Sequence, residues 1–434
     1  MKPKKLGERG ATTSLLKINL LYMNNIEIKY SNFDFSKDSF ISAQNIAEDA
    51  SNKIIDEINS KNPLYKIFSN KHALDQARES EHHAKHIKEN FSDLIVIGMG
   101  GSALNPETLT TLITPKKSTT RIHFLNNTDP FFLQDLVSKI ELASCAVLAI
   151  SNSGQTLETT SLVGVMISQF EQAGISNLGK HFYFVTNLNS GNLKNVATKI
   201  GATLIEHTPN ISGRYSGLTN VSSLVAQVAN IDIQEYLAGA ELALQEFFSK
   251  KQESQPTIAA AAIYSAEKPI TVNIGYLQKL NVFLEWYSQI IAESLGKNGA
   301  GITPIRGLGP NDQHSILQLY LDGPKDKIYS LFYTKNDHPI IKTSPLEEFD
   351  YIANKNLHDI NKANFDATLC ALNTTGAPTR SIILNDFSAK NIGSLVMHSM
   401  LEVVILGHMM KINPFNQPGV ELIKTESTRL VQNL

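Results

Sequence analysis

The chain alternates short apolar runs with longer amphipathic segments, and this alternation constrains its fold more than any other feature of the sequence. In the first half, the amphipathic segments are roughly 15 to 25 residues long and are joined by turns rich in Gly, Ser, Asn and Asp. Such a pattern predicts β-strands connected by α-helices, which form a parallel sheet with helices on both faces. The predicted strands are residues 94–97, 121–125, 145–150, 181–185 and 202–205.

A second, fainter alternation occupies the other half of the chain. Its strand-like runs are residues 270–274, 327–332 and 381–384, and its helix-like segments are residues 276–295, 357–372 and 392–411. A chain of 434 residues is too long for one ordinary hydrophobic core, so two α/β domains are expected. We expect an N-terminal extension at residues 1–40, a first domain with a helical lead-in at 41–235, a second domain at 236–411, and a C-terminal loop and helix at 412–434.

Composition and charge exclude several classes of protein. The formal net charge of -2 gives no electrostatic footprint for nucleic acid. Lys17 and Asn19 interrupt the apolar stretch near the start, so no secretory signal is predicted. The apolar run at residues 401–410 is too short and too polar to span a bilayer, and it is expected to be a buried helix. Two cysteines provide no disulfide framework, which favours a reducing, cytoplasmic location without a membrane partner.

Two strand ends in the first half carry ligand-binding patterns. The sequence GMGGS at residues 98–102 follows the first strand, and SNSGQT at residues 151–156 follows the third. The second pattern places the hydroxyls of Ser151, Ser153 and Thr156 at a helix N-terminus, where a phosphate monoester is well accommodated. The alternatives are a tight turn for the first pattern and an ordinary capping cluster for the second.

Glu293 is the candidate general base. It follows Val282, Trp286 and Ile290 at helical spacing, so it shares their apolar face. Burial of the carboxylate against apolar surface is expected to raise its pKa and to suit it to proton transfer. The alternative is a rim carboxylate that pairs with Lys297 one turn later.

Other candidate groups lie in polar turns. Arg214, in ISGRYS, is either a surface residue or a fixed positive charge in a site. His314, in NDQHS, is a candidate proton carrier, and Asp312 is expected to cap a helix that runs to residue 321. Gln417 and Lys424 flank the last loop of the chain.

These segments, in this order, resemble the glucose-6-phosphate isomerase family. The resemblance rests on GMGGS, SNSGQT, SGRYSGLTNV, ESLGK, NDQHS and FNQPGVELIK, and it spans about residues 94–424. It implies an α/β fold of two sugar-isomerase (SIS) domains, each a three-layer unit with a parallel sheet flanked by helices, plus a C-terminal helical arm that completes the active site.

The resemblance also implies an activity, namely the reversible isomerisation of D-glucose 6-phosphate to D-fructose 6-phosphate through a cis-enediolate, in glycolysis and gluconeogenesis. Glu293 then matches the base that moves a proton between C1 and C2, and Arg214 matches the cation beside the enediolate. His314 and Lys424 match the groups that open the sugar ring. In this family the histidine comes from the neighbouring subunit, which implies a homodimer. No metal or organic cofactor is expected. The matched substrate-binding residues are Gly101, Ser102, Ser151, Ser153, Thr156 and Thr159 around the phosphate, and Gln417 at the sugar.

The chain departs from the family pattern at a few positions. Asn152 stands where many members have lysine, which removes a cation from the phosphate loop and weakens binding by roughly 1 kcal/mol. Ser212 replaces a glycine, and Pro418 follows Gln417. Other functions considered are a related aldose-ketose isomerase, including one that accepts mannose 6-phosphate, and a non-catalytic sugar-phosphate sensor. A nucleotide-binding enzyme needs an acidic residue about 20 residues after the glycine loop, and Asp129 lies too far along the chain.

Overall fold

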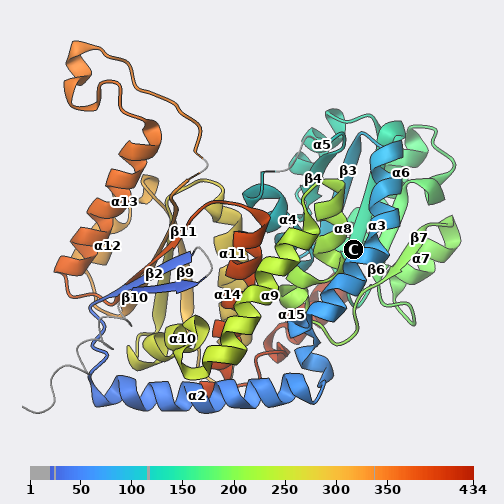
Figure 1. The fold of residues 1–434 in the computed structure, drawn as a ribbon. Helices are drawn as coiled ribbons and strands as arrows, with labels where there is room; N and C mark the ends of the chain where they lie inside the picture. Colours follow the sequence, from blue (N-terminus) through green and yellow to red (C-terminus); the bar gives the residue numbers. More distant parts are fainter. Residues whose placement is uncertain (1–19, 24–25, 115–117, 337) are drawn as a thin grey trace, which may run out of the picture.

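The computed structural model describes residues 20–23, 26–114, 118–336 and 338–434, which form two β-sheets with helices packed on their faces (Figure 1). The first sheet is entirely parallel, with strand order β4-β3-β5-β6-β7. All of its strands were predicted from the sequence. They are β3 (Asp93–Gly98), β4 (Arg121–Leu125), β5 (Cys145–Ser151), β6 (Phe182–Thr186) and β7 (Thr203–Glu206).

The central strands of the first sheet are apolar on both faces because helices cover both faces. In β3, Ile95 and Ile97 point to one core, whereas Leu94 and Val96 point to the other, as strand geometry requires. The first core is shared with α5 (Pro130–Ser138), α6 (Leu157–Gln172) and α7 (Asn192–Ile200). The second core is shared with α3 (Asn70–Asn90) and α8 (Asn220–Val228).

The second sheet has six strands in the order β1-β2-β11-β10-β8-β9. The strands β8, β9, β10 and β11 are parallel, whereas β2 pairs antiparallel with β11 and β1 pairs antiparallel with β2. The second α/β unit is therefore confirmed, but its sheet is mixed. The strand bounds are β1 (Leu20–Met23), β2 (Ile26–Ser31), β8 (Ile270–Gly275), β9 (Thr303–Leu308), β10 (Lys327–Thr334) and β11 (Thr379–Leu384).

The N-terminal region differs from its expected role as an extension. In β2, Ile26, Ile28 and Tyr30 are buried beneath the helices of the second half, while Lys29 is exposed. The helix α2 (Asp38–Asn59) packs on α10 (Gln255–Ser265) and α14 (Ala389–Met409), and Figure 1 shows it lying alongside α10. This N-terminal segment therefore joins the second sheet and its helices, although it precedes the first sheet in sequence.

Helices cover both faces of the second sheet. One face packs on α2, α9 (Ile233–Lys250), α10, α11 (Leu280–Leu295) and α14, and the other packs on α12 (Leu317–Asp322) and α13 (Leu357–Thr374). The helix α4 (Gly101–Leu112) follows β3, yet Leu104, Leu109 and Leu112 join the core of the second half. The remaining elements that bear on the site are the 3-10 turns η4 (Gly213–Leu218) and η6 (Asn311–His314) and the C-terminal helix α15 (Glu421–Val431).

The apolar run at residues 401–410 lies within α14, apart from its last residue, and the prediction of a buried helix is confirmed. By length and composition α14 could cross a membrane, but 94% of its most apolar window is buried inside the protein. Its one acidic residue, Glu402, is paired with Arg380, whose Nη1 lies 2.7 Å from the carboxylate. A long apolar helix at the centre of the core explains this composition.

Candidate active site

A cleft of about 750 Å³ lies at the carboxyl ends of β3 and β5, and α11 and the C-terminal segment also line it. Ligands of open α/β sheets bind at this edge, because the loops and helix N-termini that follow the strands converge there. All predicted site residues except His314 line the cleft. They are Gly101, Ser102, Ser151, Ser153, Thr156, Thr159, Arg214, Glu293, Gln417 and Lys424.

The loop SNSGQT is organised by its own hydroxyl groups. The hydroxyls of Ser151 and Thr156 lie 2.9 Å apart, and Ser151 Oγ also accepts from the amide of Gly154. Thr156 occupies the N-cap position of α6 but its side chain makes no capping hydrogen bond, so the alternative of a simple capping cluster does not explain the motif. Thr159 is fully buried, and its hydroxyl has no partner among the described residues. The hydroxyl groups of the loop are thus gathered at the N-terminus of α6, and the hydroxyl of Thr159 there lacks a hydrogen-bond partner among the described residues.

The loop GMGGS serves a packing role as well as facing the cleft. A Cβ on Gly101 would lie 2.2 Å from the backbone of Gly213, so only glycine permits this close approach between α4 and η4. Gly100 has a φ of +52°, a conformation that glycine adopts without strain. Ser102, in the first turn of α4, is 7% exposed and lines the cleft. The geometry of the turn therefore explains why Gly100 and Gly101 are glycines. In this loop, the side chain that could contact a ligand through a polar group is that of Ser102.

Arg214 connects three parts of the chain within the cleft. It is 1% exposed, which excludes the alternative of a surface residue. All five of its N–H groups are satisfied, so its buried charge is fully compensated. The acceptors are Ser294 Oγ at 2.9 Å from Nε, Glu293 Oε2 at 3.1 Å and Gln417 Oε1 at 2.8 Å from Nη1, and the carbonyls of Pro414 at 2.8 Å and Asn416 at 3.1 Å from Nη2.

Glu293 lies in a polar setting. Trp286 and Ile290 are buried as predicted, but the side chain of Glu293 is 34% exposed and faces the cleft. Its two oxygens accept from Gln289 Nε2 at 2.8 Å and from Arg214 at 3.1 Å. The expectation of a carboxylate held against apolar surface is therefore wrong, because α11 ends at the rim of the cleft, where Arg214 supplies a cation.

Lys297 does not pair with Glu293 as the alternative interpretation required. Its Nζ donates to the carbonyls of Ser294 and Asn413, each at 2.7 Å. Burial and the nearby Arg214 lower the pKa of Lys297 to about 8, against the opposing effect of Glu293.

His314 and Lys424 are exposed side chains. Lys424 lies at the rim of the cleft, where its Nζ is 2.6 Å from Glu421. His314 ends the 3-10 turn η6 and lies outside the cleft. The expected cap at Asp312 is wrong, since its carboxylate accepts from the amide of Leu308 at 2.8 Å and α12 begins later, at Leu317.

Several residues that line the cleft were not predicted as site residues. Gln289 lies one helical turn before Glu293, so helical spacing could have identified it. Asn187 directly follows β6, where the rule for strand ends applies. Asn152, noted as a departure from the family pattern, donates to the carbonyl of Ile211 at 2.9 Å and so joins the SNSGQT loop to the segment before Arg214.

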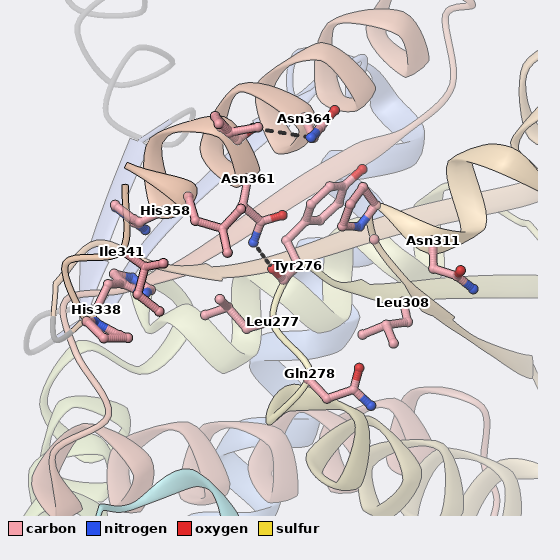
Figure 2. Close-up of a pocket in the computed structure, with 15 residues that line it drawn as sticks. Tyr276, Leu277, Gln278, Leu308, Asn311, His338, Ile341, His358, Asn361 and Asn364 are labelled. Atoms are coloured by element: carbon pink, nitrogen blue, oxygen red, sulfur yellow. Dashed lines mark hydrogen bonds between the residues drawn. The ribbon is translucent and has the colours of Figure 1, made fainter. Parts of the chain in front are cut away.

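A second cavity, of about 570 Å³, lies beyond the carboxyl ends of β8 and β9, and its lining residues are drawn in Figure 2. It is lined by apolar, amide and aromatic side chains, among them Tyr276, Leu308 and the stacked rings of His338 and His358. It contains none of the predicted site residues, and no carboxylate, lysine or arginine stands among the described residues that line it. Of the two cavities, the first cleft is therefore the one lined by side chains suited to proton transfer and anion binding.

The chain is similar in sequence to proteins of known family. The sequence pattern of the family described as "Phosphoglucose isomerase" matches residues 43–332. A glucose-6-phosphate isomerase from Rubrobacter xylanophilus is 32% identical over 351 residues, which cover 77% of this chain and 81% of the relative. One from Campylobacter jejuni is 33% identical over 347 residues, with 78% and 84% covered.

Solved structures share the fold. A hypothetical protein from Thermus thermophilus superposes with a TM-score of 0.85 at 25% identity, covering 93% of this chain and 99% of that one. A glucose-6-phosphate isomerase from Chlamydia trachomatis superposes with a TM-score of 0.82 at 19% identity, covering 95% and 90%. Because the family pattern covers most of the sequence and both relatives align across most of it, this chain belongs to the phosphoglucose isomerase family.

Proposed function

We propose that the chain is a glucose-6-phosphate isomerase that converts D-glucose 6-phosphate to D-fructose 6-phosphate and back, with Glu293 as the base. The observation that carries this proposal is the convergence of Glu293, Arg214 and the SNSGQT loop in one cleft. The relatives that match most of the chain carry the same activity in their names. The reaction is the aldose-ketose step shared by glycolysis and gluconeogenesis.

The phosphate of the substrate binds to the hydroxyl-rich loops. The cleft is lined by Ser102, Ser151, Ser153 and Thr156, and Thr156 stands at the N-terminus of α6. Hydroxyls, backbone N–H groups and the helix dipole stabilise a phosphate dianion without a lysine. The unpaired hydroxyl of the buried Thr159 supports a further hydrogen bond in this region.

The proton is transferred by one carboxylate. Glu293 takes the proton from C2 of the open-chain aldose, and the electron pair of that C–H bond forms the double bond of the cis-enediolate. The proton of the C2 hydroxyl moves to the oxygen on C1, and the same carboxyl group returns its proton to C1, so that C2 becomes the carbonyl carbon of the ketose. Gln289 and Arg214 hold the two oxygens of Glu293, so its orientation is fixed before the substrate arrives.

Arg214 stabilises the enediolate through its positive charge. Every N–H group of Arg214 is already engaged, and Nη1 serves both Glu293 and Gln417. An oxyanion at this position therefore displaces one of these two acceptors. The hydrogen bond from Arg214 to Gln417 can be broken without disturbing Glu293, and the amide of Gln417 is then free to contact the sugar.

Ring opening is assigned to Lys424 and to the partner subunit's His314 in a homodimer. Lys424 is exposed at the rim of the same cleft, whereas His314 of the same chain is exposed and outside it. An exposed histidine on a short turn is suited to reach a neighbouring subunit. A cytoplasmic location remains a prediction from the composition.

Replacement of the base tests this function. Glu293→Gln keeps the shape of the side chain but removes the proton acceptor, so kcat is expected to fall by about 10²–10⁴-fold with a small change in KM. The assay is the formation of glucose 6-phosphate from fructose 6-phosphate, coupled to a dehydrogenase.

The matched control is Glu285→Gln, two turns earlier on α11, where the carboxylate pairs with Arg306 outside the cleft. This variant is expected to keep normal activity. Normal turnover by Glu293→Gln would overturn the assignment of the base, and inactivity of the wild-type protein toward both sugar phosphates would overturn the proposed activity itself.

A further inference from the structure

Lys297 ends the ESLGK motif and joins α11 to the C-terminal segment, which we define as residues 412–424. Its Nζ donates to the carbonyl of Ser294, on its own helix, and to the carbonyl of Asn413, at the start of the segment. Both distances are 2.7 Å, which is typical of charge-assisted hydrogen bonds. The side chain does not line the cleft, so no direct contact with the substrate explains its position.

Near the cleft, the C-terminal segment is also attached through Phe415, Arg214 and the hydroxyl of Tyr215, which donates to the carbonyl of Pro414 at 3.4 Å. The helix α15, whose first turn ends the segment, has no buried residue. Phe415 packs against the rings of Tyr65 and Tyr215, with centroids 5.0 and 5.5 Å away. Arg214 holds two carbonyls further along, those of Pro414 and Asn416. Lys297 and Arg214 thus hold three main-chain carbonyls, those of residues 413, 414 and 416, just before Gln417.

The segment carries two groups assigned to the reaction. Gln417 shares Nη1 of Arg214 with Glu293, and Lys424 lies on the first turn of α15 at the rim of the cleft. Both depend on the path of the main chain that leaves Asn413. A shift of about 1 Å in such a group can reduce the rate by about a hundredfold.

We propose that Lys297 is a positioning residue that fixes the C-terminal segment through the Asn413 carbonyl and thereby aligns Gln417 and Lys424 for the isomerisation. The proposal rests on the proposed function for its catalytic consequence, but the attachment itself can be measured without any activity. The charge of the lysine strengthens both hydrogen bonds. The charged groups that face it are Arg214 from η4 and Glu293 from α11.

The electrostatic setting makes this attachment sensitive to pH. Burial, together with Arg214, lowers the pKa of Lys297 to about 8. The amine therefore loses its charge at mildly alkaline pH, and the two hydrogen bonds lose their charge assistance. Arginine at this position would keep its charge over the same range.

The test uses two variants of the full-length protein. Lys297→Met keeps the length of the side chain and removes its donors, and we expect kcat/KM to fall about tenfold to a hundredfold. Lys297→Arg restores donors and charge, and we expect it to recover most of this loss and to move the alkaline limb of the kcat/KM profile to higher pH. Lys139→Met, at an exposed lysine paired with Asp135, is the control and is expected to behave as wild type.

Hydrogen exchange of the backbone amides provides the readout that is independent of catalysis. In Lys297→Met we expect faster exchange within residues 412–424 and unchanged exchange in β3 and β5. Wild-type activity and exchange in Lys297→Met would overturn the proposal. So would a loss of activity accompanied by faster exchange throughout the protein, since that result indicates general destabilisation. If the wild type lacked isomerase activity, the exchange data would still decide whether Lys297 holds the segment.

Discussion

Three buried charged side chains, Arg214, Arg380 and Asp93, are compensated by groups from other elements of the chain. Arg214 uses all its donors, and Arg380 pairs with Glu402 in the core of the second half. Hydrogen bonds from Arg121 and His123 outweigh the effect of burial and lower the pKa of Asp93 to about 2. A buried charge without such partners would cost several kcal/mol, so these contacts are required for the fold as well as for the site.

Glu107, on α4, lies in a different environment. Burial raises the pKa of its carboxyl group to about 7, and the negative charge of Glu285 on α11 adds to the effect. Because the pKa in the folded state is above the ordinary value, the folded state loses stability as the pH rises from about 4.5 through 7. Repulsion between the carboxylates of Glu107 and Glu285 therefore weakens the contact between α4 and α11 at neutral and alkaline pH.

Glu107→Gln is expected to remove this pH dependence. At pH 8.5 the variant should be about 1–2 kcal/mol more stable than the wild type, after allowance for solvent screening, and the difference should shrink toward pH 5. Urea unfolding at the two pH values measures the effect. Glu171→Gln, an exposed position at the end of α6, serves as the control with no pH-dependent gain. Equal midpoints for Glu107→Gln and wild type at pH 8.5 would contradict the prediction.

At the level of elements, α9 and α14 cross at a distance that only glycine permits. A Cβ on Gly239 would lie 1.8 Å from the carbonyl oxygen of Lys390, and one on Gly393 would lie 1.9 Å from that of Tyr236. Ser394 donates to the carbonyl of Gly239 at 2.7 Å across the same crossing. The two helices are thus in backbone contact, and α14 carries this close packing into the centre of the second half.

Gly239→Ala is expected to destabilise the protein by about 2 kcal/mol. The added methyl group forces the two helices apart, and this costs more free energy than the higher helix propensity of alanine supplies. Gly164→Ala is the matched control within α6, where an added Cβ meets no atom within 4 Å. That variant should gain about 0.5–1 kcal/mol. Chemical denaturation of both proteins measures the two effects, and a neutral or stabilising Gly239→Ala would show that the crossing can relax.

At the level of the whole molecule, the cleft combines the two halves of the chain. The first sheet supplies the GMGGS and SNSGQT loops, α11 of the second half supplies Glu293, and the C-terminal segment supplies Gln417 and Lys424. The second cavity, near η6, occupies the corresponding edge of the second sheet but lacks charged groups among its described lining residues (Figure 2). Only His314 among the predicted site residues is outside the cleft, which supports the proposal of a site shared between subunits.

Mixed dimers test the shared site. Glu293→Gln and His314→Ala should each be nearly inactive alone, but after subunit exchange each heterodimer contains one site with both native residues. A random equal mixture is therefore expected to regain about a quarter of wild-type activity. The control is the double variant mixed with His314→Ala, which can form no complete site. Failure to regain activity, with exchange shown by mass spectrometry of tagged subunits, would place the histidine within its own subunit or outside the reaction.

The sequence by itself determined the first sheet and the loops that follow its strands. The strand β5 is buried on both faces, so its residues are apolar without interruption, and the pattern is visible locally. Ser151 and Thr156 were predicted because hydroxyls gathered after a strand have a recognisable composition. The edge strand β9 was missed, since it contains Pro304 and Arg306 and has no continuous apolar run.

The tertiary structure alone decided the features that depend on residues far apart in the sequence. Nothing near β2 in the chain indicates that it pairs with β11, more than 300 residues later. The polar environment of Glu293 depends on its hydrogen bond with Arg214. The position of Arg214 depends in turn on its hydrogen bonds to carbonyls of the C-terminal segment. Local patterns reveal which residues can bind a phosphate or carry a proton, whereas the environment of each group is set by packing between distant segments, which no local pattern contains.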